Sequence, residues 1–263
     1  MIRPAAVAGT FYPASPVTLR SALRALLAEA PRPGSVVPRG LIVPHAGYTY
    51  SGPIAASAYG FLLGEGTPIV RRVVLLGTAH RGGVRGLAAS SASAFATPLG
   101  LVPVDQDALG QCADLAQVRV DDEAHRTDHA LEVQLPFLQV TLGEFAFVPL
   151  LVGRSSPREV AEVVDRLVTG PEDLLVVSSD LSHYLGYDAA RQKDHATALL
   201  IEARDETSLT PDRACGAYAV AGSLLVARRR HWRVETVDLR NSGDTSGRTD
   251  RVVGYGAFVM RTE

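Results

Sequence analysis

The sequence contains very few of the residues that several classes of site require. Lys193 is the only lysine among 263 residues, so the chain lacks the lysine that a Walker-type phosphate loop carries after its glycine-rich turn. Schiff-base chemistry would depend on this same residue, which lies in a polar run that does not favour that role. Two cysteines, Cys112 and Cys215, exclude a disulfide framework and a cysteine-rich metal site, and they favour a reducing compartment.

Charge and hydropathy exclude two further classes of partner. The formal net charge is −2, from 26 basic and 28 acidic residues, which gives no positive field for binding nucleic acid. The longest apolar run, residues 214–227, is too short and too rich in alanine and glycine to cross a bilayer, so we expect a buried helix there. No apolar signal stretch follows Met1. We therefore expect a cytoplasmic protein that binds neither nucleic acid nor a membrane.

Short apolar runs alternate with amphipathic stretches along the chain, which is typical of an α/β fold. Strands are predicted at residues 40–44, 72–77, 99–103, 145–152, 173–177, 232–239 and 252–260, with one short strand inside a loop at 82–98. Helices are predicted at residues 17–30, 53–63, 107–116, 128–142, 157–169, 187–203 and 213–230, with a kink or restart at Pro136. We predict a single domain, residues 1–263, with a central, mostly parallel or mixed sheet flanked by helices.

Three of the seven histidines, His45, His80 and His183, closely follow predicted strands. Ligands of open α/β sheets bind beyond the carboxyl ends of the strands, so these imidazoles could converge. Asp244 lies in a glycine- and serine-rich turn that could present a carboxylate. Two histidines and one carboxylate are the ligand set of non-haem Fe(II) sites, and they also hold Zn(II). The alternative is that each histidine hydrogen-bonds within its own loop.

A second cluster contains Asp128, His129 and Glu132. Asp128 can cap the helix predicted after it, and His129 and Glu132 would share one face of that helix. This spacing fits metal ligands, and it equally fits residues that orient ligands, because ligating histidines donate their other N–H to a carboxylate or carbonyl. A structural role is the simpler interpretation of the residues alone.

The segment Ser178 to His183, with the sequence SSDLSH, raises the alternative of a serine hydrolase. A nucleophilic serine needs a base and a third group that orients this base. The chain has no G-x-S-x-G motif, and closeness along the sequence does not establish contact in space. Tyr48 and Tyr50 flank the His45 loop, where they could line a pocket or simply pack.

Five segments, in order along the chain, resemble the Memo family. They are PAAVAGTFYP at 4–13, PHAGYTYSG at 44–52, DHALEVQLPF at 128–137, SSDLSHY at 178–184, and NSGD at 241–244 with RVVGY at 251–255. The resemblance covers nearly the whole chain. It implies a fold similar to class III extradiol ring-cleaving dioxygenases, which are non-haem iron enzymes.

The resemblance also implies roles for particular residues. His45, His80 and Asp244 fall at metal-ligand positions, with Fe(II) as the expected ion and Zn(II) or another divalent metal as the alternative. His183 falls at the position of an acid–base histidine, and His129 belongs to the same pocket, so both are expected to be catalytic. Ala130 stands where many relatives have serine.

Two functions remain open from the sequence. The first is a dioxygenase-like, metal-dependent oxidoreductase acting on a small molecule, with a zinc hydrolase using the same ligands as a variant of it. The second is a non-enzymatic binding or scaffold protein that recognises a peptide or partner protein, with Tyr48, Tyr50 and Tyr184 supplying contact area. Prokaryotic members of the family often accompany a radical-SAM protein, which implies a partner in a shared pathway.

Overall fold

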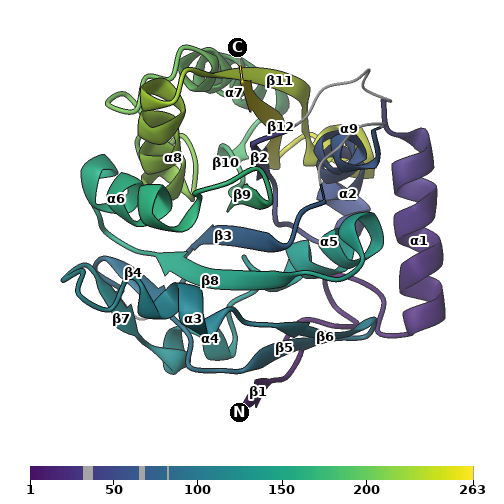
Figure 1. Ribbon diagram of the computed structural model, residues 1–263. Coiled ribbons are helices and arrows are strands. Elements are labelled where there is room, and N and C mark those ends of the chain that lie inside the picture. Colours follow the sequence, from purple (N-terminus) through teal and green to yellow (C-terminus); the bar gives the residue numbers. More distant parts are fainter. Residues whose placement is uncertain (32–37, 65–68, 82, 263) are drawn as a thin grey trace.

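The computed structural model describes residues 1–31, 38–64, 69–81 and 83–262, which form an α/β fold with two sheets (Figure 1). The strands are β1 (Ile2–Arg3), β2 (Gly40–Val43), β3 (Arg72–Thr78), β4 (Leu87–Ala89), β5 (Ala94–Thr97), β6 (Gly100–Pro103), β7 (Val118–Val120), β8 (Ala146–Val152), β9 (Asp173–Ser178), β10 (His183–Leu185), β11 (Trp232–Asn241) and β12 (Val252–Thr262). The helices are α1 (Pro16–Glu29), α2 (Tyr48–Tyr59), η1 (Gly60–Leu63), α3 (Gln106–Gly110), α4 (Asp122–Arg126), η2 (Glu132–Gln134), α5 (Leu135–Leu142), α6 (Pro157–Leu167), α7 (Tyr187–Glu202), α8 (Ala217–Arg229) and α9 (Ser242–Ser246).

Four parallel strands form the centre of the larger sheet. In the described ranges this sheet has nine strands in the order β10-β12-β2-β9-β3-β8-β4-β7, with β11 paired to β12. Strands β2, β9, β3 and β8 are mutually parallel, whereas β12 and β4 flank them in the antiparallel direction. Every residue of β2 and β9 is buried, as expected for apolar strands that are covered on both faces. The predicted mixed, mostly parallel sheet is confirmed.

Two groups of helices cover this sheet (Figure 1). Helix α6 packs along α8, which contacts β3 and β9, while α1 and α5 pack against α2, which contacts β2 and β12. Helix α1 begins behind the cap Ser15, and its Leu19, Leu23 and Leu27 are buried, as their helical spacing predicts. The buried apolar side chains of both helix groups and the sheet form one continuous cluster.

Three predicted elements differ from the structure. Residues 83–98 contain two strands, β4 and β5, where one short strand was predicted. Strand β4 pairs with β8, although the glycine- and serine-rich sequence around it weakens the periodicity that would indicate a strand. Helix α2 begins at Tyr48, before the predicted start at Pro53, and carries this proline in its interior. Helix α3 ends at Gly110, well short of the predicted residue 116.

The segment 128–142 is not the single helix that the sequence predicts. Residues 128–131 are not helical, and the short turn η2 leads into α5, which carries Pro136 in its first turn. A proline there loses no hydrogen bond, since the first amides of a helix have no partner within it. The expected restart at Pro136 is therefore confirmed. His129, however, does not share a helix face with Glu132.

The apolar run 214–227 belongs largely to α8, whose residues from Ala217 to Ala227 are almost all buried. This confirms the buried helix expected there. Within the ranges that the structure describes, no helix has the length and apolar character needed to cross a membrane.

Candidate metal centre

Two histidines meet where parallel strands end. His45 follows the end of β2 by two residues, and His80 follows the end of β3 by two residues. Both strands lie directly beside β9 and run parallel to it, so their carboxyl ends reach the same edge of the sheet. The centroids of the two imidazole rings are 5.1 Å apart.

The third ring at this edge is His129, from the non-helical stretch before η2. Its centroid lies 4.4 Å from that of His80, with the rings stacked, and 5.4 Å from that of His45. One nitrogen from each of the three rings lies within 4.8 Å of the other two. In the described parts of the chain, this is the group of histidine, cysteine or acidic side chains that could hold a metal ion.

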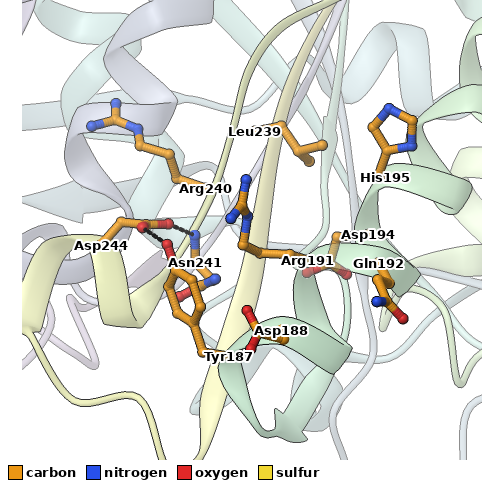
Figure 2. Close-up of a pocket in the computed structure, with 10 residues that line it drawn as sticks. All are labelled: Tyr187, Asp188, Arg191, Gln192, Asp194, His195, Leu239, Arg240, Asn241 and Asp244. Atoms are coloured by element: carbon orange, nitrogen blue, oxygen red, sulfur yellow. Dashed lines mark hydrogen bonds between the residues drawn. The ribbon is translucent and has the colours of Figure 1, made fainter.

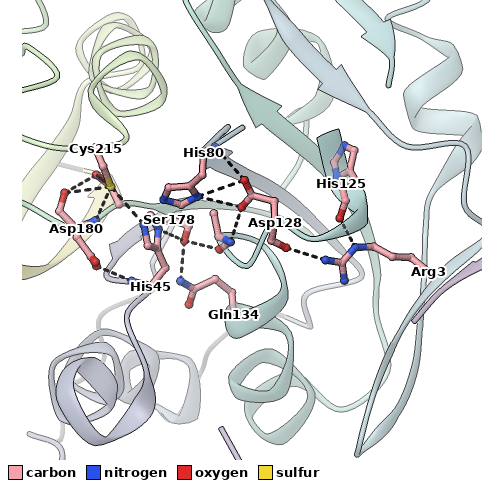
Figure 3. Close-up of polar contacts among 11 residues, drawn as sticks. Arg3, His45, His80, His125, Asp128, Gln134, Ser178, Asp180 and Cys215 are labelled. Atoms are coloured by element: carbon pink, nitrogen blue, oxygen red, sulfur yellow. Dashed lines mark hydrogen bonds and ion pairs between the residues drawn. The ribbon is translucent and has the colours of Figure 1, made fainter. Parts of the chain in front are cut away.

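Hydrogen bonds around Ser178 determine which nitrogen of His45 carries the proton (Figure 3). The Ser178 hydroxyl donates its hydrogen to the Ala130 carbonyl at 2.6 Å and accepts an N–H from Gln134 Nε2 at 2.8 Å. His45 Nδ1 lies 3.0 Å from this hydroxyl oxygen, which has no second hydrogen to donate, so Nδ1 is the donor. Nε2 of His45 therefore carries a lone pair. The serine-hydrolase alternative is disfavoured at Ser178, whose hydrogen goes to a carbonyl rather than to a base.

Asp128 determines which nitrogen of His80 carries the proton. Nδ1 of His80 lies 3.2 Å from both carboxylate oxygens of Asp128, and the backbone N–H of His80 donates to Oδ2 at 2.9 Å. Burial raises the pKa of Asp128, but the hydrogen bond and charge of His80 and nearby amides outweigh it and bring the pKa to about 2. A carboxylate in this position holds the proton on Nδ1, so Nε2 of His80 is free to bind a metal.

The rings of His45, which is buried, and His129, which is half-buried, are neutral at physiological pH. Burial, followed by the charge of His80, lowers the pKa of His45 to about 3. Burial, followed by the charges of His45 and His80, lowers the pKa of His129 to about 4. Metal ligation requires neutral imidazole, so these two rings are in the binding form without having to lose protons.

Cys215 and Asp180 line the same site, and neither was predicted as a site residue. The Sγ atom of Cys215 lies 3.3 Å from Nε2 of His45 and accepts the Asp180 N–H, also at 3.3 Å. Asp180 Oδ1 accepts the backbone N–H of His45 at 2.7 Å. Burial raises the pKa of Cys215 to about 12 and also raises the pKa of Asp180. Asp180 follows β9 as His80 follows β3, a signal that could have identified it, whereas nothing in the sequence points to Cys215.

Asp244 is not part of the converging group of three histidines, and its carboxylate bonds instead to Tyr187 and Asn241 (Figure 2). Its Oδ2 accepts the Asn241 N–H at 2.8 Å in a capping box of α9, and its Oδ1 accepts the Tyr187 hydroxyl at 2.5 Å. It lines a separate hollow of about 900 Å³ beside α7, together with Arg191. Both carboxylate oxygens are thus engaged locally. The converging set contains His129 in the place that the sequence analysis gave to Asp244.

His183 lies at the margin of the site. It is exposed at the start of β10, and its Nδ1 lies 2.9 Å from the Leu181 carbonyl, so Nδ1 donates and Nε2 is free. The charge of His183 contributes to lowering the pKa of His45, and it partly offsets the rise that burial causes in the pKa of Asp180. The acid–base role of His183 stays a prediction.

Comparisons with known proteins identify the chain's relatives. The family described as "Memo-like protein" matches residues 3–259. The MEMO1 family protein MK0963 of Methanopyrus kandleri is 35% identical, over 99% of each chain. The MEMO1 family protein of Aeropyrum pernix is 37% identical, over 97% of this chain and 98% of the relative, and that of Sulfolobus acidocaldarius is 36% identical over the same shares.

Among solved structures, the uncharacterized protein JW3007 from Escherichia coli K12 is 14% identical, with a TM-score of 0.48, over 83% of this chain and 98% of that one. This likeness is too weak to support an argument. The family match and the archaeal relatives span nearly the whole chain and confirm the resemblance of its motifs. The chain therefore belongs to the Memo-like protein family.

Proposed function

We propose that this protein is a metal-dependent enzyme that binds a divalent transition-metal ion, Fe(II) in the first instance, at His45, His80 and His129. It acts as an oxidoreductase on a small molecule. The observation that carries this proposal is the convergence of three imidazoles, two of which have their Nδ1 proton held by hydrogen bonds, so that Nε2 carries the lone pair that a metal needs.

The donor set fits such an ion. Metal–nitrogen bonds of about 2.1 Å separate neighbouring donor atoms by roughly 3 to 3.5 Å, so rings whose nitrogens lie within 4.8 Å need only close slightly. Three protein ligands leave positions open for water or substrate, which distinguishes catalytic from structural metal sites. An ion held there would supply Lewis acidity and activation of O2 or water.

The chain's own residues orient the site and handle protons. Ser178 and Gln134 hold the ring of His45, and Asp128 holds the ring of His80. Such partners fix the tautomer and raise the basicity of ligating histidines. His183, with a free Nε2 at the margin, would exchange a proton with the substrate.

The identity of the metal decides the reaction class. Imidazole suits iron, zinc, copper and nickel, and three histidines with an open position are also the ligand set of hydrolytic zinc sites. The converging group contains no carboxylate, although Asp180 and Cys215 lie beside it. Iron would support the oxidoreductase, whereas zinc alone would point to a hydrolase with the same ligands.

Metal analysis of protein purified anaerobically, without added metal, tests the proposal. We expect about one metal ion per chain in the wild type, and loss of most of it in His45→Ala and His80→Ala, because each variant removes a ligand. His195→Ala is the matched control, since His195 lies on α7 beside the hollow of Asp244 and should keep its metal. A wild type that holds no metal even after anaerobic loading with Fe(II) or Zn(II), or variants that bind as much as the wild type, would overturn it.

A further inference from the structure

A second hollow, of about 530 Å³, is lined by Tyr50, Tyr184, Arg248, Asp250 and Arg251 among others. The ring of Tyr184 lies 5.7 Å, centroid to centroid, from that of His183 at the margin of the histidine site. Tyr50 lies in the first turn of α2, directly after the loop that carries His45. Tyr184 follows His183, and the backbone of His183 pairs with the start of β12, two residues after Arg251. The hollow is therefore built from the chain segments that flank the proposed metal site.

Tyr184 is held in an unfavourable backbone conformation at the edge of this hollow. Its φ is 60°, in the left-handed region that bulky residues rarely adopt. The side chain itself is 65% exposed. The register of the β10–β12 pairing shifts between His183 and Leu185, so Tyr184 is the extra residue of a β-bulge, a feature that re-aims side chains and is frequent beside active sites. The conformation places an aromatic face at the mouth of the hollow, where the guanidinium of Arg251 lies 5.0 Å from the ring centroid.

The hollow carries one uncompensated positive charge. Arg248 forms an ion pair with Asp250 at 3.3 Å, so these two charges offset each other. Arg251 is exposed, and no carboxylate in the described residues forms an ion pair with it. A guanidinium stacked on an aromatic ring keeps its N–H edge available for a carboxylate. Tyr50, 44% exposed, adds a second aromatic surface.

We propose that this hollow is the specificity subsite of the metal site and takes a small aromatic carboxylate. Arg251 pairs with the carboxylate, and Tyr184 and Tyr50 contact the ring. The volume of about 530 Å³ lies in the range of small-molecule sites. This inference rests on the proposed function, because it names the substrate class of the same site.

Benzoate is the probe that tests it, with benzamide as the uncharged analogue and acetate as the anion without a ring. Measured by calorimetry on the metal-loaded protein, benzoate should bind about tenfold or more tightly than either analogue. Arg251→Gln should weaken benzoate binding about tenfold and leave benzamide unchanged. Arg71→Gln is the matched control, since Arg71 is exposed, pairs with Glu172 and precedes β3 at the opposite end of the sheet. An equal loss in both variants would overturn the proposal.

Tyr184→Gly separates a ligand contact from a structural role. Glycine adopts a φ of 60° without strain, so the urea midpoint of this variant should not fall below that of the wild type. Benzoate binding should nevertheless weaken severalfold, and Tyr184→Phe, which keeps the ring, should retain it. A lower midpoint with unchanged benzoate binding would show that Tyr184 is only structural and would overturn its assigned role.

The outcomes for the subsite and for the metal site are distinguishable. A protein that holds its metal but shows no Arg251-dependent benzoate binding would refute the subsite and leave the metal site standing. Arg251-dependent binding that persists in a chain unable to hold metal would support the subsite as a carboxylate site while removing the proposed enzyme. Measuring metal content and benzoate affinity on the same samples gives both results.

Discussion

Two polar clusters, one around Glu132 and one formed by His45, His80 and His129, differ in how their binding atoms are used. In the first, the fully buried carboxylate of Glu132 accepts hydrogen bonds from the guanidinium of Arg3, the amides of Ala6 and Val7, and the hydroxyl of Tyr12. In the second, His45, His80 and His129 bring their nitrogens together without a hydrogen bond among them.

The difference separates a structural cluster from a binding cluster. Buried polar groups that serve only the fold are saturated, as Glu132 is. The three converging imidazoles are instead not saturated by one another, and two of them lie where a ligand can reach them. The first cluster supports the second, because it fixes the N-terminal segment whose Phe11 lies 4.5 Å from His129, centroid to centroid.

Removing the carboxylate of Glu132 should have the largest effect on stability. Glu132→Ala leaves the buried guanidinium of Arg3 without its partner, 2.6 Å away in the native protein, and should lower the free energy of unfolding by about 3 to 5 kcal/mol. Urea denaturation of the metal-free protein measures this loss. If the alanine variant does not fold, Glu132→Gln, which keeps an acceptor oxygen, should fold with a smaller loss.

The matched control is Glu123→Ala, which breaks the exposed ion pair with Arg126. Exposed pairs contribute about 0 to 1 kcal/mol, so this variant should stay close to the wild type. If both variants lost the same amount of stability, or if Glu132→Ala were as stable as the wild type, Glu132 would not belong to a cluster that stabilises the fold.

Acid should destabilise the metal-free protein through two residues of the histidine cluster, His45 and His129. The pKa of His45 is about 3 and that of His129 about 4 in the folded protein, against 6.5 for an ordinary histidine. As pH falls below about 6.5 the unfolded chain gains protons that the folded chain does not, so stability is present above that pH and is lost below it. Between pH 7 and pH 5 each ring should account for about 1 to 2 kcal/mol.

A histidine variant isolates this effect from other titrating groups. The raised pKa of Asp180 acts in the opposite direction, and the low pKa of Asp128, about 2, matters only in stronger acid. His129→Asn removes one titrating ring and leaves both carboxyl groups. The difference in unfolding free energy between pH 7 and pH 5 should therefore be smaller in this variant than in the wild type, and an equal or larger difference would show that His129 is not held neutral.

The sequence predicts the centre of the fold well, because the apolar runs of β2, β3, β8 and β9 are buried on both faces and leave a clear signal. It predicts strands less well in segments that are rich in polar and small residues. Strands β4 and β5 lie in such a stretch and depend on pairing with strands distant in sequence. The adjacency of His45 and His80 follows from strand ends alone, since parallel neighbours finish at one edge.

The rest of the site depends on local geometry that periodicity does not reveal. His129 reaches the site because residues 128–131 are not helical, contrary to the predicted helix. The position of Asp244 was predictable in part, because Asn241 followed three residues later by an acidic side chain is the spacing of a capping box. Cys215 reaches His45 through the packing of the loop before α8, a contact across 170 residues that no local pattern encodes.

The last prediction concerns Asp128, which orients His80 without being one of the three converging donors. Asp128→Asn keeps the size of the side chain and an oxygen for the backbone N–H of His80, but it removes the charge that faces Nδ1. Loss of a carboxylate that orients a ligating histidine weakens metal binding by about 10- to 100-fold. Competition with a chelator of known affinity measures this change.

Asp122→Asn is the control that makes the result specific. Asp122 is also an aspartate that accepts several hydrogen bonds, from the hydroxyls of Ser90 and Ser91 and the amide of Ser91, but none from the three converging histidines. Its substitution should leave metal affinity unchanged. If Asp128→Asn and Asp122→Asn bind metal alike, the carboxylate beside His80 serves the fold only, and the contrast between the two clusters then depends on the histidines alone.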